Sequence, residues 1–527
     1  MTVQDHIPFK FDIILPYDTV SIETGNAEEP TFHYVLWEKI SAGDYNLYHS
    51  NIEYLLDEYI NEAFMCQNPS CENEFHKTAI DEAYLLIRDG IHVASSHFKS
   101  RNSGNKFKNV PGWNDHCKDL HLEARKKFIE WRNNDRAQNG SLFEEMKESR
   151  SKFKNALSYC KNNELRLKKE KLIDSYKLRS KNNFWKEVKT LSKNNKQSVN
   201  CINNEYKKEE IIKVFERKYK ETLDDKNSQT KPADYDVILE DVKIRNFPNS
   251  GQIFTSDLEL AISKLNTGIG FDFIHSNHLK RSNYKLKCFL ARLFSTFISH
   301  SYMPKDLLHG EIRPIIKNAS GDKTDANNYR PVMNSSNFLK LFEYCLLPRL
   351  KTIQIDKHQF GFRENTGCIN ACTVLKETIF SYNEAQSNVY CASLDLTKAF
   401  DKVNPNILTM KLAEKNVAPY AIKIIKYMNE NQFVNISFNE FKGPEWKIGN
   451  GVRQGGILSP LLFNIYMDSA LSKISNMHVG CSIDAFKVNI IGYADDILLI
   501  SPSLHGLQCL LDKFYNMMND LCFVINA

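Results

Sequence analysis

Two adjacent carboxylates, Asp495 and Asp496, lie between two strongly apolar runs, residues 488–492 and 497–500. Both runs are rich in β-forming residues, so the pattern predicts a tight hairpin with an acidic tip that enters a core. Carboxylates in such a place lose their hydration and normally require a cation. The tip therefore predicts a metal site, although a motif as short as residues 493–496 needs support from elsewhere in the chain.

A third carboxylate joins this pair if the chain folds as its pattern predicts. Residues 389–396 alternate in polarity and favour β structure, which places Asp395 at the C-terminal end of a strand. Ser459 and Pro460 predict a helix start, with the serine as N-cap. If the strand and the hairpin are neighbours in one sheet, the three aspartates converge. Such a set can hold two hard divalent ions about 4 Å apart, which is the arrangement that nucleotidyl transfer uses.

Six motifs around these residues resemble, in order and spacing, those of the reverse transcriptases of non-LTR (LINE-type) retrotransposons. The resemblance implies an α+β fold, with the fingers and palm of a right-hand polymerase preceded by a mostly helical basic connector. It also implies an RNA-directed DNA polymerase that transfers dNTPs onto a primer 3′-OH, with Mg²⁺ or Mn²⁺ as cofactor. The motifs are IRPIIK (312–317), NYRP (328–331), QFGFR (359–363), LDLTKAFDKV (394–403), GVRQGGILSPLLF (451–463) and YADD (493–496).

The resemblance implies a catalytic role for several matching residues. Asp395 and Asp495 would bind the metal ions directly, and Asp496 would be a third, less directly bound carboxylate. Phe400 would lie beneath the sugar of the incoming nucleotide, where its flat ring excludes a 2′-hydroxyl. We interpret Asp401 as a helix-start carboxylate rather than a ligand.

A second set of residues would hold the nucleotide and the primer. Lys317 and Arg330, on a fingers hairpin, would grip the triphosphate as a point charge and as a bidentate fork. Gln454 and Gly455 would line the nucleotide and template pocket, with glycine because the backbone must approach a ligand closely. Tyr493 would lie near the primer end.

Two further segments match the family less completely. Residues 268–272 resemble the Gly-rich segment that precedes the fingers, but Ile269 replaces the usual proline, which leaves its role open. Residues 4–8 resemble the closing motif of the endonuclease/exonuclease/phosphatase fold, in which Asp5 would orient His6 as a general base. Because the chain has no other part of that nuclease, we expect Asp5 and His6 to be an inactive remnant without endonuclease activity.

We expect four parts along the chain. The family continues past the palm into a primer grip and a helical thumb, so the resemblance implies a copy truncated at both ends or an incomplete gene model. The parts are an endonuclease remnant (1–15), a helical and irregular connector (16–109), a basic helical connector that binds nucleic acid (110–225), and the fingers and palm, incomplete at the C-terminus (237–527).

The formal net charge of +5 is unevenly distributed. Residues 147–196 contain 16 Lys and Arg against 5 Asp and Glu, with aromatic residues between them. A charge run is often only a solvated helical face. Interleaved aromatics in front of a polymerase instead favour a surface that grips template RNA through phosphates and stacked bases. Both interpretations stay open, and we expect the partners to be an RNA template, a DNA primer or target, and dNTPs.

The thirteen cysteines are scattered, which is typical of reduced thiols. Cys66, Cys71 and His76 come closest to a metal cluster, but no fourth ligand lies near them in the sequence and their spacing matches no common zinc module. We therefore expect ordinary cysteines there. The N-terminus has no signal-peptide pattern and no apolar run is long enough to span a bilayer, so we expect an intracellular protein of the nucleus or cytoplasm.

Three functions fit the motifs. The first is the RNA-directed DNA polymerase, and the second is a catalytically inactive truncated relic or RNA-binding module that retains the polymerase fold. An intron-type maturase is a more distant third. Asp5 and His6 resemble part of a nuclease, and maturases do not carry that nuclease upstream of the polymerase.

Overall fold

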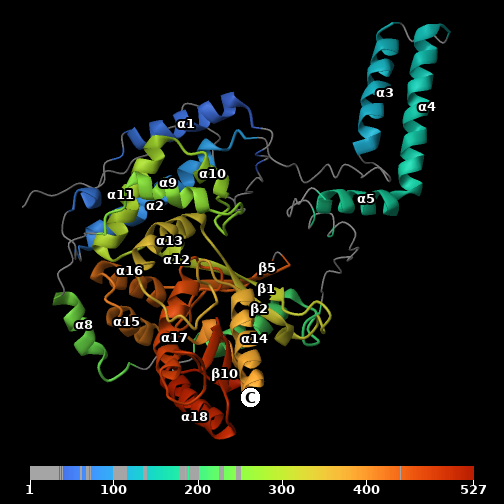
Figure 1. Ribbon diagram of the computed structural model, residues 1–527. Coiled ribbons are helices and arrows are strands. Elements are labelled where there is room, and N and C mark those ends of the chain that lie inside the picture. Colours follow the sequence, from blue (N-terminus) through green and yellow to red (C-terminus); the bar gives the residue numbers. More distant parts are fainter. Residues whose placement is uncertain are drawn as a thin grey trace, which may run out of the picture.

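The computed structural model (Figure 1) describes most of the chain and places its two larger sheets within one helical body. Within the described residues, no helix is long and apolar enough to cross a membrane. The described residues are 40–57, 62–66, 73–98, 115–134, 139–177, 201–224, 231–244, 251–439 and 441–526, with 35, 37, 59, 71, 184 and 188.

A four-stranded antiparallel sheet carries the aspartates. Its strand order is β11-β3-β10-β9, and β9 and β10 form the expected hairpin. Leu499 and Ile500 of this hairpin are fully buried, as the apolar runs predict. The helices α17 and α18 pack against these strands. The bounds are β3 Tyr390–Leu396, β9 Ile490–Tyr493, β10 Asp496–Ser501, β11 Ile525–Asn526, α17 Ser459–Ser475 and α18 Leu504–Asp520.

The start of α17 differs from the sequence prediction. Leu458, not Ser459, precedes the helix, and it already has helical backbone angles (φ −79°, ψ −25°). The expected serine N-cap is therefore wrong. The Ser459 hydroxyl instead donates to the carbonyl of Arg453 at 2.7 Å, while Pro460 lies in the first turn as expected.

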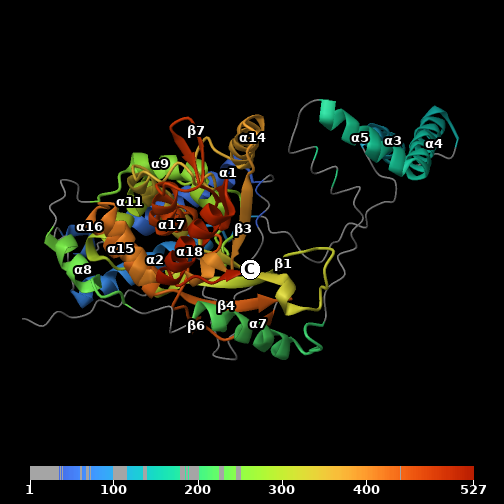
Figure 2. The ribbon, with the colours of Figure 1, turned by 60° about the horizontal axis from the view of Figure 1, so that its bottom comes forward.

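A second sheet lies beside the first and has the order β2-β1-β4-β5, with β6 also paired to β4. β1 and β2 are antiparallel, whereas β1 and β4 are parallel. Helix α7 packs against β4, as Figure 2 shows, and Phe215 of α7 is fully buried in their common core. The bounds are β1 His309–Ile316, β2 Tyr329–Ser335, β4 Phe433–Phe438, β5 Phe441–Lys442, β6 Trp446–Lys447 and α7 Lys208–Leu223.

The helices before the first sheet share its main core. Tyr84 of α2 and Phe294 of α11 both belong to this cluster, together with residues of α17 and α18. The bounds are α1 Ala42–Asp57, η2 Glu62–Met65, α2 Glu74–Ala94, α9 Thr255–Lys264, α10 Ser276–Lys280, α11 Tyr284–His300, α12 Lys305–Leu308 and α13 Asn337–Leu350.

The remaining elements of the body surround the two sheets. Helix α8 packs on α15, and α14 packs on β9 and β7. The bounds are α8 Tyr235–Ile244, η4 Ala326–Asn328, α14 Cys368–Glu384, η5 Ala399–Lys402, α15 Pro405–Glu414, α16 Pro419–Glu430, β7 Cys481–Ile483 and β8 Phe486–Val488.

The basic part of the chain forms helices, as the sequence predicts. These are α3 Asp115–Asn133, α4 Ser141–Asn162 and α5 Glu164–Lys177. Helices α3 and α4 pack together, with the Cys117 and Cys160 sulfurs 3.4 Å apart, and both figures draw the three helices away from the body.

Candidate active site

The sheet register brings two of the three expected carboxylates face to face. β3 and β10 are antiparallel, and Asp395 is the direct partner of Asp496. Directly opposed residues of antiparallel strands project to the same face of the sheet. On its other side Asp395 pairs with Asn526 of β11. The strand and hairpin are thus neighbours, as the prediction of a common site requires.

The third carboxylate, Asp495, lies in the turn between β9 and β10. Tyr493 pairs with Asp496, so Ala494 and Asp495 form a two-residue turn. Ala494 has a φ of 57°, and a positive φ at this position is typical of the turns that match the twist of a hairpin. The turn therefore holds Asp495 beside the Asp395–Asp496 pair.

The acidic tip is less buried than the apolar runs predict. Asp495 is half-buried and Asp496 is exposed, so the expectation of a buried tip is wrong for Asp496. Asp395, at the end of β3, is exposed as well. Burial raises the pKa of Asp495, and the neighbouring charges of Asp496 and Asp395 raise it further, while Arg330 opposes them. Three mutually repelling carboxylates within electrostatic reach fit a hard divalent cation, which would relieve that repulsion.

The two expected triphosphate ligands lie at the end of the β1–β2 hairpin. Lys317 and Arg330 are both exposed, and Arg330 follows Tyr329 at the start of β2. The backbone N–H of Lys317 donates to the Asn328 carbonyl at 2.6 Å and continues the ladder. Arg330 lies near enough to Asp495 to lower the pKa of that carboxyl, so the structure places Arg330 within electrostatic reach of the acidic tip.

Phe400 is half-buried and is held between two other rings. It stacks on Phe463 of α17 with ring centroids 4.6 Å apart and planes 14° apart. Phe362 meets it edge-on at 6.0 Å. The Phe400 carbonyl accepts the N–H of Val452 at 2.8 Å, which joins two of the sequence motifs. The ring is therefore fixed by packing rather than free to rotate.

Asp401 has a role that the sequence does not reveal. It lies in the short 3₁₀ helix η5, but its carboxylate is buried and accepts a hydrogen bond from Gln454 Nε2 at 2.5 Å. Burial raises the pKa of Asp401 to about 6, while Gln454 and Lys398 act in the opposite direction. Asp401 thus orients the side chain of Gln454, a contact that no local pattern predicts.

Gly455 lies directly against the backbone of β2. The Gln454 carbonyl accepts the N–H of Met333 on β2 at 3.0 Å. Gly455 has a φ of 102°, and a Cβ there would lie 3.0 Å from the Met333 carbonyl oxygen. A side chain would be strained on both counts, so this position requires glycine. The close approach in the structure is to β2 itself.

The other singled-out residues are simply placed. Tyr493 is 39% exposed at the end of β9. Asp272 accepts hydrogen bonds from the Ser336 hydroxyl at 2.6 Å and from the Ile274 N–H at 3.2 Å, which is a structural role for the Gly-rich segment. Asp5 and His6 lie outside the described residues.

Comparisons with known proteins agree with this geometry. Residues 317–527 match the family described as reverse transcriptase (RNA-dependent DNA polymerase). The C-terminal part of the chain is therefore a reverse transcriptase domain, and it is related to those of non-LTR retrotransposons.

Three relatives illustrate the similarity. The Pol polyprotein of the type-2 retrotransposable element R2DM of Drosophila melanogaster is 26% identical over 201 residues, which are 38% of this chain and 19% of the relative. The probable RNA-directed DNA polymerase from transposon BS of the same species is 25% identical over 320 residues, 59% of this chain and 33% of the relative. The Pol polyprotein of the type-1 element R2 of Bradysia coprophila is 30% identical over 205 residues, 38% and 23% respectively.

This chain thus spans about a fifth to a third of the length of these relatives. Among solved structures, apo telomerase from Candida tropicalis superposes with a TM-score of 0.32 at 14% identity, over 42% of this chain and 43% of that one. So low a score supports no conclusion.

Proposed function

We propose that the chain is the polymerase part of a non-LTR retrotransposon reverse transcriptase, which copies RNA by adding dNTPs to a primer 3′-OH. The single observation that carries this proposal is the register that opposes Asp395 to Asp496 with Asp495 in the adjoining turn, inside a matched reverse transcriptase domain. In this assignment the sheet of β3, β9 and β10 with α17 is the palm, and the β1–β2 hairpin is part of the fingers.

Asp395, Asp495 and Asp496 would hold two divalent ions, Mg²⁺ or Mn²⁺. Bound there, the ions would lower the pKa of the primer hydroxyl and neutralise the charge of the triphosphate. Asp395 and Asp495 are the direct ligands in this proposal, and Asp496 supports them as a less directly bound carboxylate. The exposure of Asp395 and Asp496 leaves room for the waters and phosphate oxygens that such ions keep as ligands.

The nucleotide would lie between the acidic tip and the β1–β2 hairpin. Arg330 and Lys317 would bind the triphosphate, the arginine with two parallel hydrogen bonds and the lysine as a point charge. The locked ring of Phe400 would exclude a ribose 2′-hydroxyl. Gln454, oriented by Asp401, and Gly455 would line the same pocket, with Gly455 keeping β2 close.

The primer and the template would approach from outside this pocket. Tyr493, exposed and paired with Asp496, would contact the primer end. The basic helices α4 and α5, in the connector of residues 110–225, would grip template RNA. Residues 1–15 and 16–109 would precede it, and residues 237–527 would form the fingers and palm.

Primer extension on an RNA template tests the proposal. We expect Asp495→Asn to lower the rate by about a thousandfold or more, since it weakens the stabilisation that a metal ion gives. Asp484→Asn is a matched control, because Asp484 is an exposed turn residue of the β7–β8 hairpin. If wild type and Asp495→Asn are equally inert while RNA binding persists, the chain is an inactive module and the proposal fails.

A further inference from the structure

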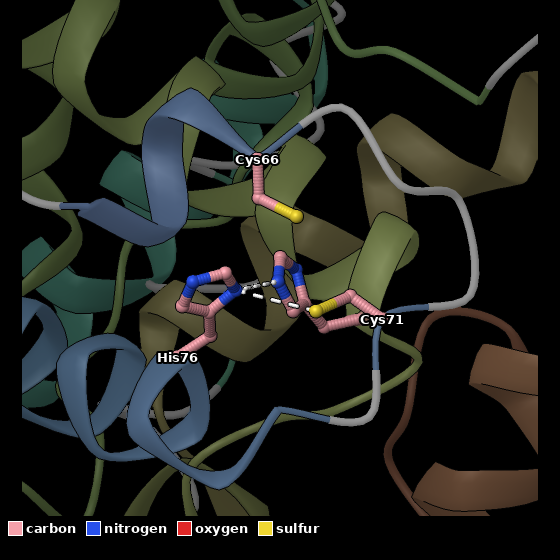
Figure 3. A group of neighbouring side chains, drawn as sticks. Cys66, Cys71 and His76 are labelled. Atoms are coloured by element: carbon pink, nitrogen blue, oxygen red, sulfur yellow. Dashed lines mark hydrogen bonds between the residues drawn. The ribbon is translucent and has the colours of Figure 1, made fainter. Parts of the chain in front are cut away.

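A second group of metal-ligating side chains lies outside the proposed active site. Cys66, Cys71 and His76 are joined in space by His300, the last residue of α11. The four ligand atoms all lie within 4.8 Å of one another. Figure 3 shows the side chains of Cys66, Cys71 and His76 converging on one point. A fourth candidate ligand therefore lies near the trio in space, although none lies near it in the sequence.

His300 escapes a sequence search because it is 224 residues from His76 in the chain. Zinc modules are recognised in a sequence by short spacings between their ligands. The spacings between residues 66, 71 and 76 match no common module, and the interval from His76 to His300 is far too long for one. Packing of η2 and α2 against α11 is what brings the four residues together.

The separations match the edges of a tetrahedral site. Zn–N bonds of about 2.0 Å and Zn–S bonds of about 2.3 Å place ligand atoms about 3.3–3.8 Å apart around one ion. Cys71 Sγ lies 3.3 Å from His76 Nδ1, and His76 Nδ1 lies 3.2 Å from His300 Nε2. Both distances are close to that range, so one ion could contact all four atoms after small side-chain adjustments.

The hydrogen bonds of His300 orient it as a ligand. Its Nδ1 lies 3.0 Å from the Thr296 carbonyl oxygen, which can only accept, so Nδ1 carries the proton. Nε2, which faces the cluster, then presents its lone pair. A ligating histidine commonly donates its other N–H to a carbonyl in this way.

We propose that Cys66, Cys71, His76 and His300 bind one zinc ion. Two thiolates and two imidazoles in tetrahedral array are a typical donor set for Zn²⁺, and four protein ligands leave no open position for catalysis. The ion is structural. It joins the segment before α2 to the C-terminal end of α11, which lies within the residues proposed as fingers and palm, and it does not depend on the proposed polymerase activity.

A neighbouring contact indicates what the ion would hold in place. Just after His300, the Tyr302 hydroxyl donates to the carboxylate of Asp81 on α2, with O–O distances of 2.8 and 2.9 Å. Zinc would thus be a second tie between α2 and the turn after α11. Removing the zinc ion should loosen the contact between α2 and the turn after α11. Because α11 also packs on α16, the effect should reach that helix as well.

Metal analysis of the whole chain is the first test. The protein is purified without a metal-affinity tag, in excess Mg²⁺, and zinc is measured by inductively coupled plasma mass spectrometry. We expect about one zinc ion per chain in wild type. The variants Cys71→Ser and His300→Asn should lose most or all of the zinc. Cys288→Ser, on the same helix as His300, and the exposed His478→Asn are matched controls that should retain it.

Two measurements keep the test decisive if a ligand variant does not fold. Cobalt(II) exchanged into wild type should give the visible absorption of a tetrahedral thiolate–imidazole site, and a zinc chelator should lower the melting temperature of wild type by several degrees. A folded wild type that contains no zinc and takes up neither zinc nor cobalt would overturn the proposal. So would unchanged zinc in the two ligand variants.

Discussion

The side chain of Gln359 holds the backbone of Ala494 in the acidic hairpin. Gln359 Oε1 accepts the Ala494 N–H at 2.9 Å, and it also accepts the N–H of Gly361 at 2.9 Å. Gln359 is fully buried, so no water can replace these bonds. The segment around it also pairs with Gly492 through two backbone hydrogen bonds of 2.8 Å. The QFGFR motif, which has no assigned role in the sequence, therefore positions the turn that carries Asp495.

Gly361→Ala tests this positioning. A Cβ on Gly361 would collide with the backbone nitrogen of Ala494 and lie 3.0 Å from the Tyr493 carbonyl carbon, and backbone cannot turn aside as a side chain can. We expect a loss of stability of about 1–3 kcal/mol and a fall in primer extension beyond that of a merely destabilised chain.

Gly367→Ala is the matched control for that variant. Gly367 has an extended φ of −166°, and the nearest atom to its Cβ would be Asn370 Oδ1 at 4.0 Å. Its melting temperature and extension rate should stay near those of wild type. Equal behaviour of Gly361→Ala and Gly367→Ala would contradict the positioning role.

Phe400→Val tests the sugar gate. The smaller side chain should admit ribonucleotides, because it leaves space where a 2′-hydroxyl would otherwise meet the ring. We expect the ratio of NTP to dNTP incorporation to rise by about 10- to 100-fold, the range that a steric pocket contact supplies. Loss of the stack on Phe463 will lower stability as well. A ratio of rates measured on one preparation is insensitive to that loss, and an unchanged ratio would remove the gate from Phe400.

Asp401→Asn tests the buried carboxyl through pH. The folded pKa of Asp401 is about 6, above its unfolded value of 3.8, so folding favours the protonated form. Its contribution to stability is fully present below about pH 4 and is lost as the pH rises through 6, a change of up to about 3 kcal/mol. Asparagine removes this dependence but can still accept from Gln454.

Denaturant unfolding of both chains across this pH range measures the effect. The variant should become progressively more stable than wild type between pH 4 and 6, and the difference should level off above that. Gln454→Met, which removes a hydrogen bond that lowers the pKa, should move the window upward. A difference in stability that does not vary with pH would contradict a raised pKa.

The elements of the site are predictable from the sequence because strand periodicity is local. The alternation that ends at Asp395 and the apolar runs around the YADD motif specify a strand and a hairpin, and both form. Contacts between distant segments carry no such signal. Gln359 is 135 residues from Ala494, Asp401 is 53 from Gln454 and His76 is 224 from His300.

Those distant pairs depend on how whole elements pack, and no spacing rule encodes packing. The burial of the tip was overestimated for a related reason. The apolar runs around it fill the core through Leu499 and Ile500, while Asp496, the first residue of β10, is exposed at the end of the sheet. A hydrophobic flank thus predicts where strands lie but not which side chains at their ends face solvent.

The basic helix α5 bears directly on the two interpretations of the charge run. Lys169 and Lys171 are exposed, while Lys168 also forms an ion pair with Glu164 at 2.5 Å, as a solvated helix face does. If the helix grips RNA, neutralising all three lysines to glutamine should weaken RNA binding roughly tenfold at moderate salt. It should also reduce the slope of log affinity against log salt by about 2, since each lost phosphate contact releases less counterion.

A control of equal charge separates this effect from a change in net charge. Neutralising Lys411, Lys423 and Lys426 removes the same charge from α15 and α16, which are helices of the body. Filter binding or fluorescence anisotropy with single-stranded RNA at several salt concentrations compares the two triple variants. Removing phosphate contacts must change the number of counterions released on binding. If the α5 variant keeps the salt slope of wild type, or if the control variant loses as much RNA affinity as the α5 variant, the lysines of α5 are a solvated face.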